Sequence, residues 1–209
     1  CHFGIDSLCW ARRGANVVGV DFCSQSIEEA KKLNEELGLN ASFVCSDIYS
    51  LNEVLKKEKE QFDIVYTSYG VIDWLPDLNE WASVIAYFLK PNGFFYIVEY
   101  HQFMKVLDDN FERVEYSYVN SEIIESDVEG SYAVPEPGIS KKEYTWNHSF
   151  SEILNSLIQS GLRIEFFNEH MNSPFDCFRG LCVEENGSYC IPTLKNKIPL
   201  LFSVKASKQ

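Results

Sequence analysis

The first hundred residues alternate between short apolar runs and segments with a helical spacing of apolar residues. The apolar runs cover residues 16–20, 41–47, 62–66 and 93–101. Helical spacing precedes or separates them at residues 6–13, 24–38, 50–60 and 77–90. Nearly continuous apolar strands separated by helices are typical of a parallel sheet covered on both faces. The alternation therefore predicts a doubly wound, mostly parallel α/β fold.

Capping residues predict where three helices begin. Ser50 and Glu53 have the spacing of a capping box. Asp77 stands in front of the helix that follows the third apolar run, and Ser149 precedes another over residues 150–160. These positions fix the expected helix starts more closely than periodicity alone.

The pattern changes after residue 101. Residues 102–147 mix a short helical piece, a strand-like stretch and a segment rich in glycine and proline, which predicts an inserted lid or β-arm. Strands are expected at 162–170 and 200–206, and without a helix between them the last strand is expected to pair antiparallel. We interpret residues 1–209 as one domain carrying this insertion.

The visible chain starts with a helix, whereas a sheet of this kind starts with a strand. Residues 1–4, "CHFG", have the character of a turn after a strand. We therefore expect the first strand to lie upstream of Cys1, within a further ~40–60 residues that supply a helix and a strand.

Charge and cysteine content narrow the range of functions. The chain has 18 basic and 31 acidic residues, a net charge of −13, and no basic cluster, which argues against nucleic acid as a partner. No apolar run approaches the ~20 residues of a membrane span. The seven cysteines are an odd, scattered set, which favours reduced thiols and a cytoplasmic location. Cys177, Cys182 and Cys190 lack the C-x-x-C pairs of a zinc site, so no metal is expected.

The carboxyl ends of the strands carry the polar groups, and ligands of a doubly wound sheet bind at that edge. Asp21 ends one strand, where a carboxylate can accept hydrogen bonds from both ribose hydroxyls of an adenosine. Asp47 ends the next and can accept from an adenine amino group, with Phe22 and Ile48 on the two faces of the ring. The alternative is that both aspartates only begin turns.

At these residues the chain resembles the class I S-adenosylmethionine-dependent methyltransferases. The motifs are "CHFG", "VVGVDF", "CSDI", "FDIVYTSYGVIDWL" and "LKPNGFFYIVE". "YTWNHSF" and "PLLFSVKA" look like a bacterial small-molecule branch of that family. The resemblance implies a Rossmann-like sheet with an antiparallel C-terminal strand and S-adenosylmethionine as cofactor. The implied cofactor-binding residues are Cys1, His2, Phe3, Gly4, Asp21, Phe22, Asp47, Ile48, Thr67 and Ser68.

The chain departs from the family pattern in the first turn. Gly4 matches the last glycine of the family's motif, but His2 stands where a glycine is usual. A histidine there narrows the turn or contacts the cofactor's carboxylate itself. Cys23 replaces a frequent serine.

The acceptor site is expected to contain aromatic side chains and a base. Tyr69, Trp74 and Trp146 are candidates for lining it, although Trp74 could equally be core. His101, at the end of a strand, is the leading candidate for a general base, and His148 is a second. His101 is also a candidate acceptor contact.

Taken together, the sequence predicts a cytoplasmic enzyme, monomeric or homodimeric, that methylates a small molecule. One alternative is a non-catalytic protein with a methyltransferase-like fold. An NAD(P)-dependent oxidoreductase shares the sheet and the acidic residue, but the Tyr-x-x-x-Lys pair common in that class is absent.

Overall fold

The computed structural model describes residues 1–119, 122–129 and 140–209, and these form two compact units. The first unit is Cys1–Lys59 and the second is Glu60–Gln209. Each unit is described by itself below. Whether the chain acts as a single domain stays a prediction. Among the described residues, no helix combines the length and apolarity needed to cross a bilayer.

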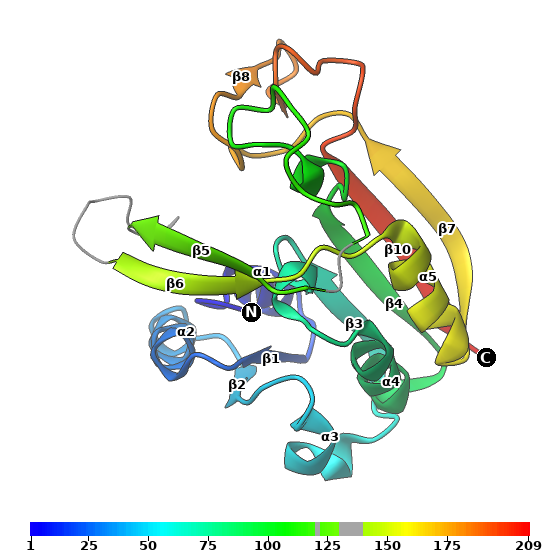
Figure 1. Cartoon of the computed structure of the whole chain (residues 1–209). Helices are drawn as coiled ribbons and strands as arrows, with labels where there is room; N and C mark the ends of the chain where they lie inside the picture. The colour runs from blue at the N-terminus through cyan, green and yellow to red at the C-terminus, as the bar shows by residue number, and fades with distance from the viewer. Residues whose placement is uncertain (120–121, 130–139) are drawn as a thin grey trace. The chain divides into compact units, whose positions relative to one another are not determined.

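The first unit packs helices against a pair of parallel strands (Figure 1). Its elements are α1 (Ile5–Arg12), β1 (Val17–Asp21), α2 (Ser24–Glu36), β2 (Ala41–Cys45), α3 (Leu51–Val54) and the 3-10 helix η1 (Lys56–Glu58). The strands pair in register, with Gly19 opposite Phe43. Leu8, Ile27, Ala30 and Phe43 form its buried core. The elements follow the alternation seen in the sequence.

The ring of Phe43 lies against two glycines of this unit. A Cβ atom at Gly4 would stand 2.6 Å from Phe43 Cε1, and one at Gly19 would stand 2.8 Å from it. Gly4 also has φ +75, a conformation that other residues rarely adopt. Gly4 therefore lets the turn before α1 lie directly on the core.

The second unit is built on a four-stranded sheet in the order β3-β4-β10-β7. The strands are β3 (Phe62–Ser68), β4 (Leu89–Tyr100), β7 (Leu162–His170) and β10 (Leu201–Lys208). β3 and β4 are parallel, and β10 runs antiparallel to both β4 and β7. The expected antiparallel pairing of the last strand is confirmed.

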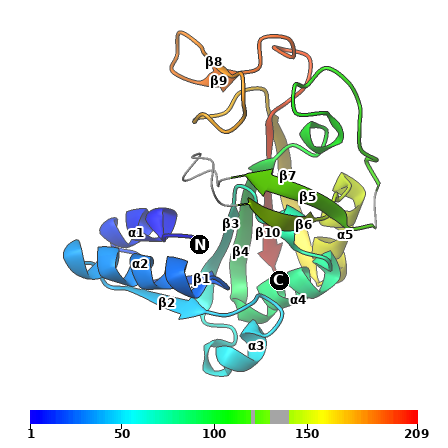
Figure 2. The ribbon, with the colours of Figure 1, turned by 60° about the vertical axis from the view of Figure 1, so that its left-hand side comes forward.

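Helices α4 (Leu78–Phe88) and α5 (Phe150–Gln159) lie side by side on one face of this sheet (Figures 1 and 2). Trp81 of α4 is buried edge-on against Phe95 of β4, with ring centroids 5.4 Å apart. The helices begin as predicted, because the side chain of Asp77 accepts hydrogen bonds from the N–H groups of Asn79 and Glu80. Ser149 caps α5 in the same way.

Two local predictions are corrected. Ser50 forms no side-chain cap on α3; instead its N–H donates to Asp47 Oδ1 at 2.9 Å, so the turn is closed by the aspartate. β4 begins at Leu89 rather than at residue 93, because Leu89 already pairs with Phe62 before the register shifts.

The stretch after β4 contains the antiparallel pair β5 (Ile124–Glu129) and β6 (Ser140–Thr145). This pair lies inside the segment for which a lid or β-arm is predicted, and residues 120–121 and 130–139 of that segment are outside the described residues. The remaining short elements are the 3-10 helices η2 (Ile72–Trp74) and η3 (Met104–Val106) and the hairpin of β8 (Cys182–Val183) and β9 (Tyr189–Cys190). The function of the arm as a lid stays a prediction.

Candidate functional site

In the first unit, Asp21 is held in one orientation at the end of β1. Its Oδ2 accepts the N–H of His2 at 2.7 Å, and its Oδ1 accepts the N–H of Cys23 at 2.9 Å. Burial acts to raise the pKa of Asp21, but the N–H of Cys23, the positive amino group of Cys1 and the N–H of His2 together keep the pKa below its usual value. Asp21 is therefore an ionised acceptor with a fixed direction.

The turn formed by residues 1–4 lies beside this carboxylate. Cys1 N is 2.7 Å from Val20 O, at the end of β1. His2 has φ 50, in the left-handed region, and its ring is 3.8 Å from that of Phe3 between centroids. This conformation explains why a glycine suits the position, and the histidine adopts it nonetheless. The predicted cofactor residues of the turn thus meet Asp21.

Phe22 and the end of β2 also belong to the candidate site of the first unit. The ring of Phe22 is 73% exposed, which leaves it open to stack on a ligand. The N–H of Ser46 donates to Asp21 O at 3.0 Å and joins the two strand ends. Asp47 is exposed and Ile48 is half-buried just beyond.

These residues fit an adenosine. A carboxylate offers about four lone-pair positions, and Asp21 Oδ1 accepts the N–H of Cys23. Asp21 therefore keeps acceptor capacity for a ribose hydroxyl, and the exposed ring of Phe22 offers an apolar face for the base. Neither feature requires a rearrangement of the main chain.

In the second unit, the fully buried Glu99 organises the loop after β3. Its carboxylate accepts the N–H groups of Gly70 (2.5 Å), Val71 (2.8 Å) and Tyr100 (2.8 Å). Burial, together with the nearby charge of Asp73, raises the pKa of Glu99. The loop it holds includes two residues with positive φ, Tyr69 at 35 and Gly70 at 77. Glu99 thus fixes the backbone that carries the predicted acceptor residues.

Beside it lies an ion pair between Asp73 and Lys105. Asp73 is buried and uses Oδ2 for the pair, whereas its Oδ1 is buried without a hydrogen-bond partner. Lys105 Nζ also lies 5.1 Å from the centre of the Tyr100 ring. Burial acts to lower the pKa of Lys105, but the charge of Asp73 outweighs it and raises the pKa. Asp73 therefore holds one unsatisfied oxygen next to a fixed positive charge.

Aromatic side chains surround the same loop. Tyr69 packs edge-on against Phe175, with ring centroids 4.8 Å apart, and lies 6.3 Å from Tyr100. Trp74 is 43% exposed, so it is not a core residue. The main-chain N–H of Trp146 donates to the main-chain oxygen of Asp73 at 2.9 Å. The structure thus places Trp146 beside Asp73, and Tyr69 on the loop that Glu99 holds.

Thr67 and Ser68 form the last residues of β3 and are half-buried. The N–H of the next residue, Tyr69, continues the pairing by donating to Val98 O at 2.9 Å. These two residues therefore lie at the carboxyl end of the strand, where the sequence predicts them.

Both candidate histidines are enclosed by protein. The ring of His101 is fully buried, with Nε2 2.9 Å from Glu169 Oε1 and Nδ1 accepting the N–H of Phe103. Burial lowers the pKa of His101 despite the opposing effect of Glu169. His148 Nε2 lies 2.8 Å from Leu75 O, and its Nδ1 is 3.0 Å from Glu152 Oε2. Because these contacts already engage the ring nitrogens, neither histidine is well placed to take a proton from a bound acceptor.

The sequence reasoning assigned no role to Glu99 or Lys105 and named Asp73 only as a neighbour of Trp74. The sequence could have indicated a role for Glu99, because it is a charged residue in an otherwise apolar strand. The pairing of Asp73 with Lys105 joins separate elements, η2 and η3, and no local pattern indicates it.

Comparison with known proteins agrees with this geometry. Residues 1–93 match a family model described as a methyltransferase domain. A solved structure also resembles this chain. The S-adenosylmethionine-dependent methyltransferase from Methanosarcina mazei superposes on it with a TM-score of 0.63 at 19% identity, and the match covers 100% of this chain and 89% of the other. Residues 1–93 therefore resemble a methyltransferase domain, and the fold of the chain resembles that of S-adenosylmethionine-dependent methyltransferases.

Two further proteins that this chain resembles are informative. The ubiquinone biosynthesis O-methyltransferase of Coxiella burnetii is 31% identical over 124 residues, which is 59% of this chain and 48% of that protein. The chain thus spans about half the length of this curated relative. The geranyl diphosphate C-methyltransferase of Streptomyces coelicolor, solved with Mg²⁺, geranyl diphosphate and S-adenosyl-L-homocysteine, has a TM-score of 0.62 at 12% identity. The match covers 100% of this chain and 68% of the Streptomyces coelicolor protein, and this likeness shows the Rossmann-like fold.

Proposed function

We propose that this protein transfers a methyl group from S-adenosylmethionine to a small-molecule acceptor. The observation that carries the proposal is the end of β1. There the Asp21 carboxylate is held by the N–H groups of His2 and Cys23, next to an uncovered Phe22 ring. The match of residues 1–93 to a methyltransferase domain supports the same conclusion.

Residues of the first unit bind the donor in this proposal. Asp21 accepts hydrogen bonds from the ribose hydroxyls, and Asp47 accepts one from the adenine amino group. Phe22 and Ile48 cover the adenine ring, and the turn at residues 1–4 contacts the rest of the donor. The donor supplies an electrophilic methyl group on a sulfonium. Donor contacts of Thr67 and Ser68, in the second unit, stay predictions.

The second unit supplies the acceptor site. We infer that Asp73 Oδ1 takes the proton that a hydroxyl acceptor loses as it is methylated, because this oxygen is buried and has no partner. Lys105 holds the other carboxylate oxygen and so fixes the direction of the first. Tyr69 and Trp146 offer aromatic surface. A hydroxyl acceptor agrees with the relative that is named an O-methyltransferase.

In this account His101 and His148 position neighbouring segments and do not touch the acceptor. His101 joins the end of β4 to β7 through Glu169, and His148 joins the start of α5 to the residues after η2. The proposal includes three further points. The acceptor is a small molecule rather than a nucleic acid, the protein acts in the cytoplasm, and it is a monomer or a homodimer.

A transfer assay tests the activity. The purified protein is incubated with S-adenosylmethionine tritiated on the methyl group and with a low-molecular-weight cell extract, and tritium is counted in the small-molecule fraction. The wild type is expected to transfer label, and Asp21→Ala is expected to lose most of it. Asp63→Asn removes an exposed carboxylate that pairs with Lys90, and it serves as the control.

Two outcomes would contradict the proposal. Transfer that is equal in the wild type and in Asp21→Ala would remove the assigned donor site. Absence of transfer from a folded protein that also fails to bind S-adenosylhomocysteine would favour the non-catalytic alternative.

A further inference from the structure

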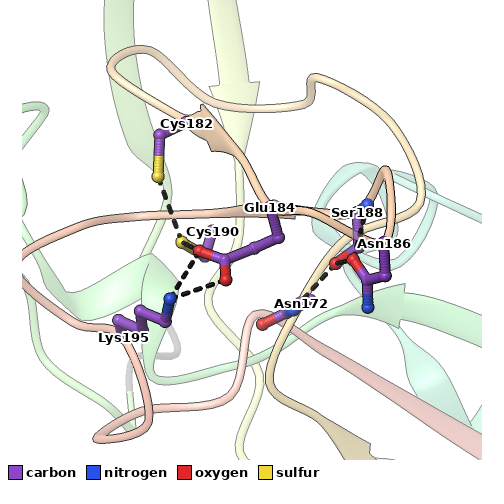
Figure 3. A network of polar contacts seen from close by, with 7 residues as sticks. All are labelled: Asn172, Cys182, Glu184, Asn186, Ser188, Cys190 and Lys195. Atoms are coloured by element: carbon purple, nitrogen blue, oxygen red, sulfur yellow. Dashed lines mark hydrogen bonds and ion pairs between the residues drawn. The ribbon is translucent and has the colours of Figure 1, made fainter.

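A short hairpin between β7 and β10 brings two cysteines and a carboxylate together (Figure 3). Cys182 of β8 and Cys190 of β9 are direct partners in the antiparallel register, and their sulfur atoms are 3.2 Å apart. Glu184 stands two residues after Cys182. Its Oε1 accepts a hydrogen bond from the Cys190 thiol at 2.8 Å. One ligand atom from each residue lies within 4.8 Å of the others.

Contacts within the hairpin fix the chain that carries these groups. Gly187 turns the chain with φ 81, and its N–H donates to Glu184 O at 2.9 Å. Asn186 Oδ1 accepts both the N–H and the hydroxyl of Ser188, and Asn172 donates to the same hydroxyl at 2.8 Å (Figure 3). These contacts therefore fix the backbone of β8 and β9 and so the relative positions of Cys182, Glu184 and Cys190.

The carboxylate is also oriented from its outer side. Lys195 Nζ lies 2.6 Å from Glu184 Oε2 and 2.8 Å from Oε1. Oε1 faces the sulfur atoms, so Lys195 can keep Oε2 while Oε1 binds another partner. Outer contacts of this kind orient the ligands of metal sites.

We propose that Cys182, Glu184 and Cys190 bind a Zn²⁺ ion. Two thiolates and one carboxylate are a donor set that zinc accepts, whereas Mg²⁺ and Ca²⁺ prefer oxygen ligands alone. Binding releases the thiol protons to solvent and involves no change of oxidation state. Three protein ligands leave the fourth position to water, as in open zinc sites.

The size of the cluster suits such an ion. Ligand distances of ~2.0–2.3 Å place the donor atoms of a tetrahedral zinc site about 3.5–3.8 Å apart. The present sulfur–sulfur and sulfur–oxygen separations are slightly shorter, so the side chains open by less than an ångström or so to admit it.

A surface pocket adjoins Glu184 and Lys195. It has a volume of about 530 Å³ and is lined by Val183, Glu184, Glu185, Asn186 and Lys195. Cys190 itself is buried, yet its sulfur faces the Glu184 carboxylate rather than apolar side chains. The sequence predicts no metal here because the C-x-x-C pairs are missing, and it gives no sign that the hairpin brings Glu184 to Cys182 and Cys190.

A disulfide between the two cysteines is the competing use of the same geometry. The register that pairs the two cysteines would also permit this bond, so the experiment below distinguishes the two uses.

The test is a metal titration of the whole protein, reduced and freed of metal with a chelator. Zn²⁺ uptake is followed by competition with a chromogenic chelator, and Co²⁺ serves as a spectroscopic probe of thiolate ligation. We expect one equivalent to bind. Glu184→Gln and Cys190→Ser should each weaken binding at least about tenfold. Cys177→Ser, in the same segment and outside the cluster, should leave binding unchanged.

Because Cys190 is buried, its variant is first checked by thermal unfolding, and the more accessible Glu184→Gln keeps the test decisive if that variant misfolds. The proposal is overturned if the wild type retains no stoichiometric Zn²⁺. It is equally overturned if Glu184→Gln binds as tightly as the wild type. Recovery of a Cys182–Cys190 disulfide from protein that takes up no metal after reduction would assign the pair to redox chemistry instead.

Discussion

Two charged side chains of the second unit, Glu99 and Lys105, have specific partners. Glu99 is satisfied by main-chain N–H groups, and Lys105 is satisfied by Asp73. Burying a charge without such partners costs several kcal/mol, so these contacts are required for the fold. Asp73 Oδ1 is the exception, because it is buried and has no hydrogen-bond partner. That unmet acceptor is why we place the proton-accepting role at Asp73.

Replacing Asp73 should therefore damage turnover without damaging donor binding. Asp73→Asn keeps the shape of the side chain and removes its basicity, so kcat is expected to fall about 10²–10⁴-fold. The affinity for S-adenosylhomocysteine, measured by calorimetry, should change by less than about threefold, since Asp73 is not assigned to the donor site.

His101→Gln is the matched comparison, and it should lower kcat far less than Asp73→Asn does. Because Asp73→Asn leaves Lys105 without its charged partner, the double variant Asp73→Asn with Lys105→Met separates chemistry from instability. A larger kcat loss in His101→Gln than in Asp73→Asn would return the base to the histidine.

His101 should make stability depend on pH. Burial lowers its pKa below the ordinary 6.5, so between its folded pKa and pH 6.5 the unfolded chain binds more protons than the folded protein. Stability is then expected to fall as the pH drops from 7 toward 5. Urea unfolding should show a smaller fall for His101→Gln, and an identical fall in both proteins would contradict this account of the ring.

The positions of Asp21 and Asp47 at the ends of strands were predictable from sequence, whereas their roles stay predictions. Asp21 and Asp47 follow apolar runs, and the carboxyl ends of strands in such a sheet face the ligand edge. The catalytic assignment of the histidines was less secure, because sequence does not show that Glu169 and Leu75 occupy their ring nitrogens. A long-range contact of this kind appears only in the folded chain.

At the scale of elements, the turn before α1 depends on one glycine. Gly4→Ala would place a methyl group 2.6 Å from Phe43 Cε1 as well as impose φ +75 on alanine. Overpacking of this kind costs about 1–3 kcal/mol beyond the conformational strain. Chemical denaturation should therefore show a marked loss of stability in the first unit.

Gly14→Ala is the control for that substitution. Gly14 also has positive φ, at +92, but nothing lies within 4 Å of an added Cβ. Gly14→Ala should therefore lower the free energy of unfolding only by the conformational strain, about 1–2 kcal/mol. Equal losses in the two variants would show that contact with Phe43 contributes nothing.

Element boundaries were predictable where side chains cap helices and less so where strands pair. Asp77 and Ser149 cap as their positions indicate. The early start of β4 at Leu89 was not predictable, because it depends on pairing with Phe62 of another strand. Periodicity reports which face is apolar, and it does not report the register between strands.

At the scale of the whole molecule, the net charge of −13 sets which partners can approach. Such a field repels a phosphate backbone. Electrophoretic mobility shift assays with duplex DNA and with structured RNA are expected to show no complex at ~0.15 M salt. A salt-sensitive complex with either would contradict the assignment of a small-molecule acceptor.

The central claim is that the first unit binds the adenosine of S-adenosylmethionine through Asp21. Calorimetric titration of the protein with S-adenosylhomocysteine, and separately with NAD, tests it most directly. The account predicts binding of S-adenosylhomocysteine alone, weakened at least about tenfold by Asp21→Ala through loss of hydrogen bonds to a charged group. Asp63→Asn should bind as the wild type does. Binding of NAD instead, or unchanged affinity in Asp21→Ala, would contradict the account.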